Sequence, residues 1–198
     1  MENLPKRLAQ QLKFVMEIDK LKNIYRQNLI ADASRRENDA EHSWHLAVLA
    51  VLLAEYVPEP VDLLKVMKMV LLHDVVEIDA GDVFCYDPEA AVGKEEREIK
   101  AAERIYGLLP ADQGRELREL WDEFEARATP EAKFAACLDR LQPLLLNFHT
   151  EGGTWRIHDV PAAKVRQRME PIAQISPALG EAVEQLLQEA IARGILQE

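Results

Sequence analysis

The amino-acid sequence predicts an all-α fold, on three observations. Apolar residues recur at three- and four-residue spacings along most of the 198-residue chain, which is the period of amphipathic helices. Prolines and the Gly152-Gly153 pair punctuate these segments, as they do between helices. No segment alternates apolar and polar residues for long enough to predict a strand. A bundle of about seven to nine helices is therefore expected.

The first predicted helix runs from about Lys6 to Tyr25. Its apolar residues recur every three or four positions from Leu8 to Ile24, so they share one face. The polar stretch "RQNLIADASRREND" that follows has no helical pattern. Arg26, the first residue of this stretch, is thus expected at the end of the first helix.

Two further helices follow that stretch. One runs from about Ala40 to Tyr56 and ends before Pro58, because a proline disfavours helical backbone in the residue before it. The next runs from about Val61 to Val76 and is apolar on nearly all sides, which predicts the central buried helix. After an irregular segment, the remaining predicted helices span about Lys94–Leu109, Asp112–Ala126, Glu131–Phe148, Ala162–Gln174 and Pro177–Ala192.

One domain, residues 1–198, is expected, because no repeat, low-complexity tract or long linker divides the chain. With 48% apolar residues, the chain can bury a sizeable core. The last helices, about residues 160–195, are amphipathic and would pack either on this core or on a partner.

Charge and composition exclude several classes of protein. The formal net charge of −11 argues against binding to nucleic acid or to anionic membranes, since both need a basic face. No run of apolar residues is long enough for a transmembrane helix, and the N-terminus has no secretory pattern, so a cytoplasmic protein is expected. Cys85 and Cys137 are too few for a disulfide framework and lie in no zinc-binding spacing.

Histidine and aspartate side chains interrupt three of the predicted helices. His42 and His73 each lie on the apolar face of a helix, and Asp74 follows directly. Asp139 lies in the apolar run "FAACLDRLQPLLLNF". Imidazole nitrogens and carboxylate oxygens together suit a divalent transition metal, and four such ligands leave positions open for water and substrate. Taken singly, each residue also fits a structural role, as a hydrogen-bonded core histidine or as Asp139 paired with Arg140.

Three segments around these residues form a pattern: "EHSWHLAVLA", "LLHDVVEIDAGD" and "CLDRLQPLL". This pattern resembles the HD-domain metal-dependent phosphohydrolases, and within them the small bacterial group related to 5′-deoxynucleotidases and human HD domain-containing protein 2. The similarity extends to "SRRENDAEHSW", "LWDEFEARATPEAKFAACLDRLQPLLLN" and "EGGTW", so it covers about residues 15–157. The resemblance implies a single HD-domain helical bundle.

The resemblance also implies a metal site. His42, His73, Asp74 and Asp139 would bind one divalent ion, which could be Mn, Co, Fe, Ni, Zn or Mg. Two-metal HD enzymes have additional histidines between the His-Asp pair and the last aspartate. This chain has none there, so a single metal ion is expected.

Acidic and basic residues near the metal complete the implied site. Glu77 and Asp82 match positions beside the metal, where Glu77 would handle the attacking water and Asp82 would help to hold the substrate. Arg26 matches an arginine near the substrate phosphate, and Arg35 is a further candidate, because a guanidinium binds phosphate oxygens bidentately. The deoxynucleotidases carry tryptophan at or soon after that arginine, whereas this chain has "RQNL".

The implied function is hydrolysis of a phosphomonoester in nucleotide metabolism through a metal-activated water, with a nucleoside 5′-monophosphate as the expected substrate. Two alternatives stay open: hydrolysis of a cyclic nucleotide or nucleoside triphosphate, and a metal-dependent nucleotide sensor without turnover. The expected partner is thus a small phosphoester, with no nucleic acid and no membrane. Because the relatives are commonly dimeric, a homodimer or higher homo-oligomer is also expected.

Overall fold

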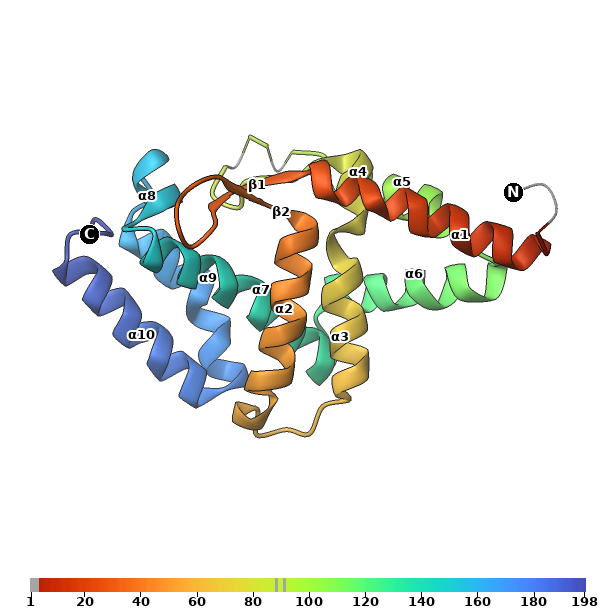
Figure 1. Ribbon diagram of the computed structural model, residues 1–198. Coiled ribbons are helices and arrows are strands. Elements are labelled where there is room, and N and C mark those ends of the chain that lie inside the picture. The colour runs from red at the N-terminus through yellow and green to blue at the C-terminus, as the bar shows by residue number, and fades with distance from the viewer. Residues whose placement is uncertain (1–3, 88, 91) are drawn as a thin grey trace.

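The computed structural model describes residues 4–87, 89–90 and 92–198. It is a helical fold with one small two-stranded sheet, so the all-α prediction is confirmed (Figure 1). None of the helices in these residues has the length and apolar character needed to cross a membrane. The α-helices are α1 (Lys6–Ile18), α2 (Asp39–Leu53), α3 (Leu63–Leu72), α4 (Glu77–Ala80), α5 (Lys94–Tyr106), α6 (Ala111–Ala126), α7 (Pro130–His149), α8 (Gly153–Ile157), α9 (Ala162–Ile175) and α10 (Pro177–Ala192).

The first predicted helix is shorter than expected. After α1 the chain forms a 3₁₀ helix, η1 (Asp19–Asn23), and then strand β1 (Tyr25–Leu29). Arg26 therefore lies on a strand and not at the end of a helix. β1 pairs with the antiparallel strand β2 (Arg36–Asn38). The sequence pattern missed both strands because neither alternates apolar and polar residues.

The third predicted helix is divided. α3 passes into the 3₁₀ helix η3 (His73–Val76) and then into the short α4. Gly81 ends α4 with a φ of +77°, a conformation that glycine adopts without steric cost, and the chain turns there. α3 is also not the central buried helix, because Leu64 and Leu71 on it are exposed.

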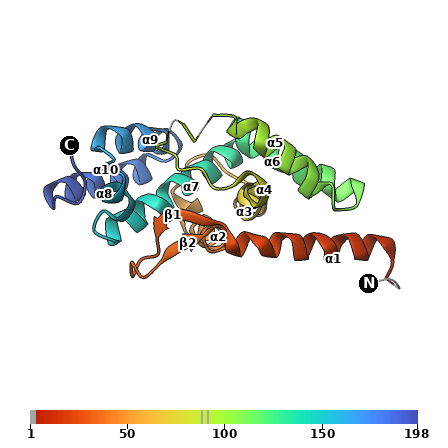
Figure 2. The same ribbon diagram turned by 90° about the horizontal axis from the view of Figure 1, so that it is seen from above.

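The larger core lies between α2, α3, α7, α9 and α10. The helix that buries most residues is α7, where Phe134 and Leu138 are fully buried. α9 and α10 pack on the same core through Val165 and Leu187. Each such side chain stabilises the fold by roughly 1.5–3 kcal/mol. Figure 2 shows α7 running through the middle of the molecule, with α1 and α2 along one side.

A smaller apolar cluster supports the η3 segment. Val75 of η3 is buried in it together with Ile105 and Tyr106 of α5. The Tyr106 hydroxyl donates a hydrogen bond to the carbonyl of Leu72, with 2.9 Å between the oxygens. The chain is thus fixed immediately before His73.

Helix α7 contains a proline that joins it to the sheet. Pro143 has no N–H, so the carbonyl of Asp139, four residues earlier, lacks its usual helical donor. The carbonyl of Pro143 accepts hydrogen bonds from the side-chain amides of Asn28 and Asn147, at 3.4 Å and 3.0 Å. β1 and α7 are therefore held together beside Asp139.

Candidate metal centre

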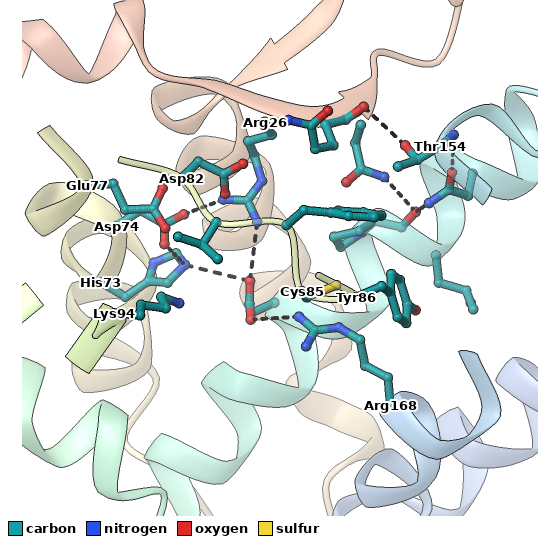
Figure 3. Close-up of a pocket in the computed structure, with 18 of the residues that line it drawn as sticks. Arg26, His73, Asp74, Glu77, Asp82, Cys85, Tyr86, Lys94, Thr154 and Arg168 are labelled. Carbon is teal, nitrogen blue, oxygen red and sulfur yellow. Dashed lines mark hydrogen bonds and ion pairs between the residues drawn. The ribbon is translucent and has the colours of Figure 1, made fainter. Parts of the chain in front are cut away.

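A cavity opens beside η3. Its volume of about 300 Å³ is at the lower end of the range for small-molecule sites. Segments far apart in the sequence meet there: β1, η3, α4, the loop after Gly81, and α7 (Figure 3). The sequence-predicted residues that line it are Arg26, His73, Asp74, Glu77, Asp82 and Asp139.

His42 lies behind this wall and is fully buried. Its Nδ1 is 2.9 Å from Oε1 of Gln142, whose Nε2 in turn donates to Glu37 at 2.6 Å. The amide oxygen must accept, so Nδ1 carries the proton and Nε2 keeps its lone pair. Burial lowers the pKa of His42, which keeps the ring neutral. The Nε2 lies 3.2 Å from Oδ1 of Asp139, where a cation between the two acceptors would relieve their repulsion.

His73 presents its own nitrogen to the same place. Its Nδ1 donates to the carbonyl of Val70 at 3.0 Å, which leaves the buried Nε2 without a hydrogen-bond partner. This Nε2 is 3.1 Å from Oδ1 of Asp74. One ligand atom each from His42, His73 and Asp139 lies within 4.8 Å of the others. Two imidazoles whose tautomers are fixed by their second nitrogens, together with carboxylates, fit a divalent ion.

The electrostatics also favour a cation here. Burial lowers the pKa of His73, but the carboxylates of Asp74 and Asp139 outweigh that effect and raise it to about 10. In the metal-free protein a proton on His73 therefore supplies positive charge among the carboxylates. A metal ion bound at Nε2 would replace that proton.

Arg26 lies beside the candidate metal ligands, with its side chain only 12% exposed. Its Nη1 donates to Oδ2 of Asp74 at 2.7 Å and to Oδ1 of Asp39 at 3.2 Å. Its Nη2 is 3.9 Å from Oδ1 of Asp139. Asp39 was not predicted from the sequence, because a carboxylate in the first turn of a helix is ordinary there and favoured by the helix dipole.

Asp39, Glu77 and Asp82 form a second acidic group, with one oxygen of each within 4.8 Å of the others. Burial raises the pKa of all three, that of Asp39 to about 7 and that of Glu77 well above its ordinary value. Oδ2 of Asp39 and Oε2 of Glu77 are buried without a hydrogen-bond partner. The group can therefore hold a proton or a cation next to the His-Asp cluster.

Arg35 lies elsewhere. It forms a bidentate pair with Glu41, at 2.6 Å and 2.8 Å, and is not among the residues that line the cavity. Glu41 and Asn38 cap the N-terminus of α2 with reciprocal hydrogen bonds. The position of Arg35 thus supports a role in the start of α2 and gives no support to its expected role in phosphate binding.

Sequence reasoning missed three cations in the cavity wall: Arg127, which follows α6, and Lys94 and Arg168, whose contacts bear on the site. Lys94 of α5 lines the cavity, with Nζ 3.2 Å from Oε1 of Glu98. Arg168 of α9 lies on the other side, with Nη2 3.9 Å from Oδ2 of Asp139. In the sequence both look like charges on the solvated face of a helix. Their inward position depends on how α5 and α9 pack, and no local pattern reports that.

Asp79 does not join the site. Its carboxylate pairs with Arg104, with Nη2 and Oδ1 2.8 Å apart, and Arg104 also contacts Glu17. This carboxylate therefore links α4 to α1 and α5 outside the cavity.

Comparison with known proteins identifies the family. A model of the HD domain matches residues 18–179. The human 5′-deoxynucleotidase HDDC2 is 30% identical over 135 residues, which make up 68% of this chain and 65% of that protein. The 5′-deoxynucleotidase hdd1 of Schizosaccharomyces pombe is 28% identical over 122 residues, or 58% of this chain and 59% of that protein. The chain thus spans somewhat less than two thirds of the length of these relatives.

Solved structures agree. The crystal structure of a predicted metal-dependent phosphohydrolase from Magnetospirillum magnetotacticum has a TM-score of 0.93 and 57% identity, and the match covers 97% of this chain and 96% of that one. An HD-domain phosphohydrolase from Listeria innocua has a TM-score of 0.60 at 19% identity, a likeness of fold, and the match covers 92% of this chain and 86% of that one. The resemblance inferred from the sequence is confirmed, and the chain belongs to the HD-domain family.

Proposed function

We propose that this protein is a metal-dependent phosphohydrolase that removes the phosphate from a nucleoside 5′-monophosphate. The observation that carries this proposal is the meeting of two imidazole Nε2 atoms, two aspartates and a buried arginine beside one cavity. Such a set can bind a metal and a phosphate side by side. The names of the relatives, which are 5′-deoxynucleotidases, favour a nucleotide as the substrate.

The metal would be held by His42, His73, Asp74 and Asp139. A divalent ion there supplies Lewis acidity, which lowers the pKa of water and withdraws charge from a phosphate oxygen. The mixed nitrogen and oxygen donors admit Mn, Co, Fe, Ni, Zn or Mg, among which availability decides.

Glu77 would orient the attacking water and take its proton. The water oxygen forms a bond to phosphorus, the ester P–O bond breaks, and the nucleoside oxygen receives a proton. Burial and the charges of Asp74 and Asp39 raise the pKa of Glu77, which makes its carboxylate a stronger base toward the proton of the water than an exposed glutamate is. Asp82 shares the same acidic group and would hold the sugar side of the substrate.

Arg26 would neutralise the phosphate as charge develops on it. Its Nη2 donors face Asp139 at 3.9 Å, too far for a hydrogen bond, so they can turn to a phosphate oxygen. Gln27 and Asn28 line the cavity next to Arg26, in the stretch where the deoxynucleotidases carry tryptophan. We therefore propose nucleoside 5′-monophosphates as a class, with either ribose or deoxyribose.

We propose that a second copy of the chain covers an apolar strip on α2. Trp44, Val48 and Val51 recur on one face of α2 and are exposed, with Trp44 at 64%. Leu12 and Val15 of α1 are also exposed, and α1 lies along the same side of the molecule as α2 (Figure 2). Exposed apolar side chains on neighbouring elements are typical of an interface, and homodimers are the commonest oligomers.

A cytoplasmic location also belongs to this proposal. Cys85 and Cys137 are free thiols. Free cysteines are typical of proteins in a reducing compartment.

A screen of phosphorylated compounds tests the function. Metal-reconstituted wild-type protein is compared with Asp74→Ala on nucleoside monophosphates, cyclic nucleotides and nucleoside triphosphates, each with Mn²⁺, Co²⁺ or Mg²⁺. The expected result is phosphate release from monophosphates by the wild type and none by the variant. If the wild type hydrolyses only cyclic nucleotides or only triphosphates, that class is the substrate in place of nucleoside monophosphates. Tight nucleotide binding without turnover of any compound would indicate a sensor.

A further inference from the structure

A second cavity, of about 550 Å³, adjoins the candidate metal centre. We call it the cationic groove, after the three basic side chains that line it: Arg140 of α7 and Lys164 and Arg168 of α9. It shares Arg168, Cys85 and Tyr86 with the cavity at the metal centre, and Figure 3 shows these three residues grouped at one end of that cavity. A ligand that reaches from one cavity into the other must therefore pass Arg168.

The positive charge of the groove is poorly compensated. Among its described lining residues Asp87 is the sole carboxylate, and that carboxylate already accepts hydrogen bonds from two backbone N–H groups of its own loop. In a chain with a net charge of −11, such a local excess of cations favours an anion.

The two arginines also keep donors for a ligand. Nη1 of Arg140 donates to the carbonyl of Ala136 at 3.1 Å. Nη2 of Arg168 is 3.9 Å from Oδ2 of Asp139, beyond hydrogen-bond distance. A guanidinium has five N–H donors in a planar fork, so each side chain can still bind phosphate oxygens.

We propose that the cationic groove binds a second phosphate group of the substrate. The substrate class would then be nucleotides that carry a phosphate in addition to the one hydrolysed at the metal centre. A single molecule is favoured over a separate anion because one guanidinium, that of Arg168, borders both cavities. An anion in the groove and a phosphate at the metal centre would contact the same side chain, and a covalent link between them avoids a second loss of association entropy. This inference rests on the proposed function and names its substrate more closely.

Phosphate release tests the inference. Metal-loaded wild-type protein is supplied with a nucleoside 5′-monophosphate, the matching 3′,5′-bisphosphate and the matching 5′-diphosphate. We expect kcat/KM for one of the doubly phosphorylated compounds to exceed that for the monophosphate by about tenfold, because charge-assisted hydrogen bonds add to binding. The compound that gains shows where the second phosphate is attached.

Two variants make the comparison specific. In the double variant Arg140→Gln/Lys164→Gln, kcat/KM for the doubly phosphorylated compound should fall to about the value for the monophosphate. Turnover of the monophosphate should stay unchanged. Arg166→Gln is the matched control: Arg166 also lies on α9 but pairs with Glu184, and its variant should keep the advantage. Equal kcat/KM values in the wild type, or an advantage that survives in the double variant, would overturn the inference.

Folding and the proposed function are checked separately. If the double variant loses monophosphate turnover, Lys164→Gln alone gives the test, because Lys164 is exposed. This variant should lose part of the advantage, and the loss should be smaller at high salt, which already screens the lysine charge in the wild type. If the wild type hydrolyses no monophosphate, the proposed function fails. Calorimetry then tests the groove separately, by comparing the affinity of the bisphosphate for the wild type and for the double variant. Equal affinities would overturn the inference that the groove binds a phosphate group.

Discussion

Arg26 on β1 donates a hydrogen bond from Nη1 to Oδ2 of Asp74 on η3, with 2.7 Å between the two atoms. This contact joins the small sheet to the segment that carries His73 and Asp74. It also places a permanent positive charge next to buried carboxylates, whose charge it compensates. The stability of the metal-free protein therefore depends on Arg26.

Arg26→Ala should destabilise the metal-free protein by about 3 kcal/mol, because it leaves Asp39 buried without its cation and Asp74 with the His73 imidazolium as its remaining close partner. Urea unfolding monitored by circular dichroism measures this loss. Saturation with Mn²⁺ should recover part of it, since a cation at the metal centre again compensates Asp74. A loss below about 1 kcal/mol would show that the carboxylates hold protons instead.

Glu77→Ala should lower kcat for a nucleoside monophosphate by about 10²–10⁴-fold, the usual effect of removing a group that moves a proton. Metal content should stay at the wild-type level, because Glu77 is not one of the expected ligands. Asp79→Ala is the control: Asp79 lies on the same short helix but pairs with Arg104 outside the cavity, so its variant should keep full activity. Equal effects of the two substitutions would contradict the role of Glu77.

Metal binding at pH 8 should release about one proton per ion. His73 has a pKa of about 10 in the metal-free protein, raised against burial by Asp74 and Asp139, so it is protonated at this pH and must lose the proton to bind metal. His42 is neutral, because burial lowers its pKa, and it contributes none. Affinity should therefore rise with pH up to about 10. Calorimetry in buffers of different ionisation enthalpy counts the protons, and a count of zero at pH 8 would exclude His73 as a ligand.

Stability of the metal-free protein should fall between pH 5 and pH 8 because of Glu37. Burial raises the pKa of this carboxyl to about 7, so the folded state favours the protonated form. Its contribution to stability is fully present below the ordinary value of 4.5 and is lost as the pH rises through about 7. Glu37→Gln, which stays uncharged, should reduce this fall by roughly 2–3 kcal/mol. Parallel curves for the two proteins in pH-dependent urea unfolding would contradict the prediction.

Trp44→Lys should convert the proposed dimer into a monomer, because it introduces a charge into the apolar strip on α2. Sedimentation velocity measures the change. Ile157→Lys is the matched control, since Ile157 is almost as exposed, at 61%, but lies on α8. A monomeric wild type, or a dimer that survives Trp44→Lys, would exclude this interface.

The sequence predicted the helices well where apolar periodicity is strong. α2 begins within one residue of the predicted start, and His42 and His73 are buried as their helical faces indicate. The predictions failed where tertiary contacts decide. β1 forms because β2 pairs with it, and this pairing leaves no mark in the short polar stretch "RQNL".

The site could be predicted only in part, for a similar reason. Residues with chemistry typical of metal binding were visible in the sequence, because charged groups in apolar runs need partners. Asp39, Lys94 and Arg168 were not visible, because each lies where a charged residue is common on a helix. Arg35, which looked suitable by residue type, pairs with Glu41 outside the cavity.

Pro143 shows how the fold exchanges stability for a defined site. A proline in the interior of a helix costs about 3 kcal/mol relative to alanine, and here the hydrogen bond that is lost belongs to the carbonyl of Asp139. An alanine at this position would supply the missing N–H and restore the bond. The chain therefore carries a weaker helix at the turn that presents a candidate metal ligand, and sequence optimisation for heat resistance would target this proline first.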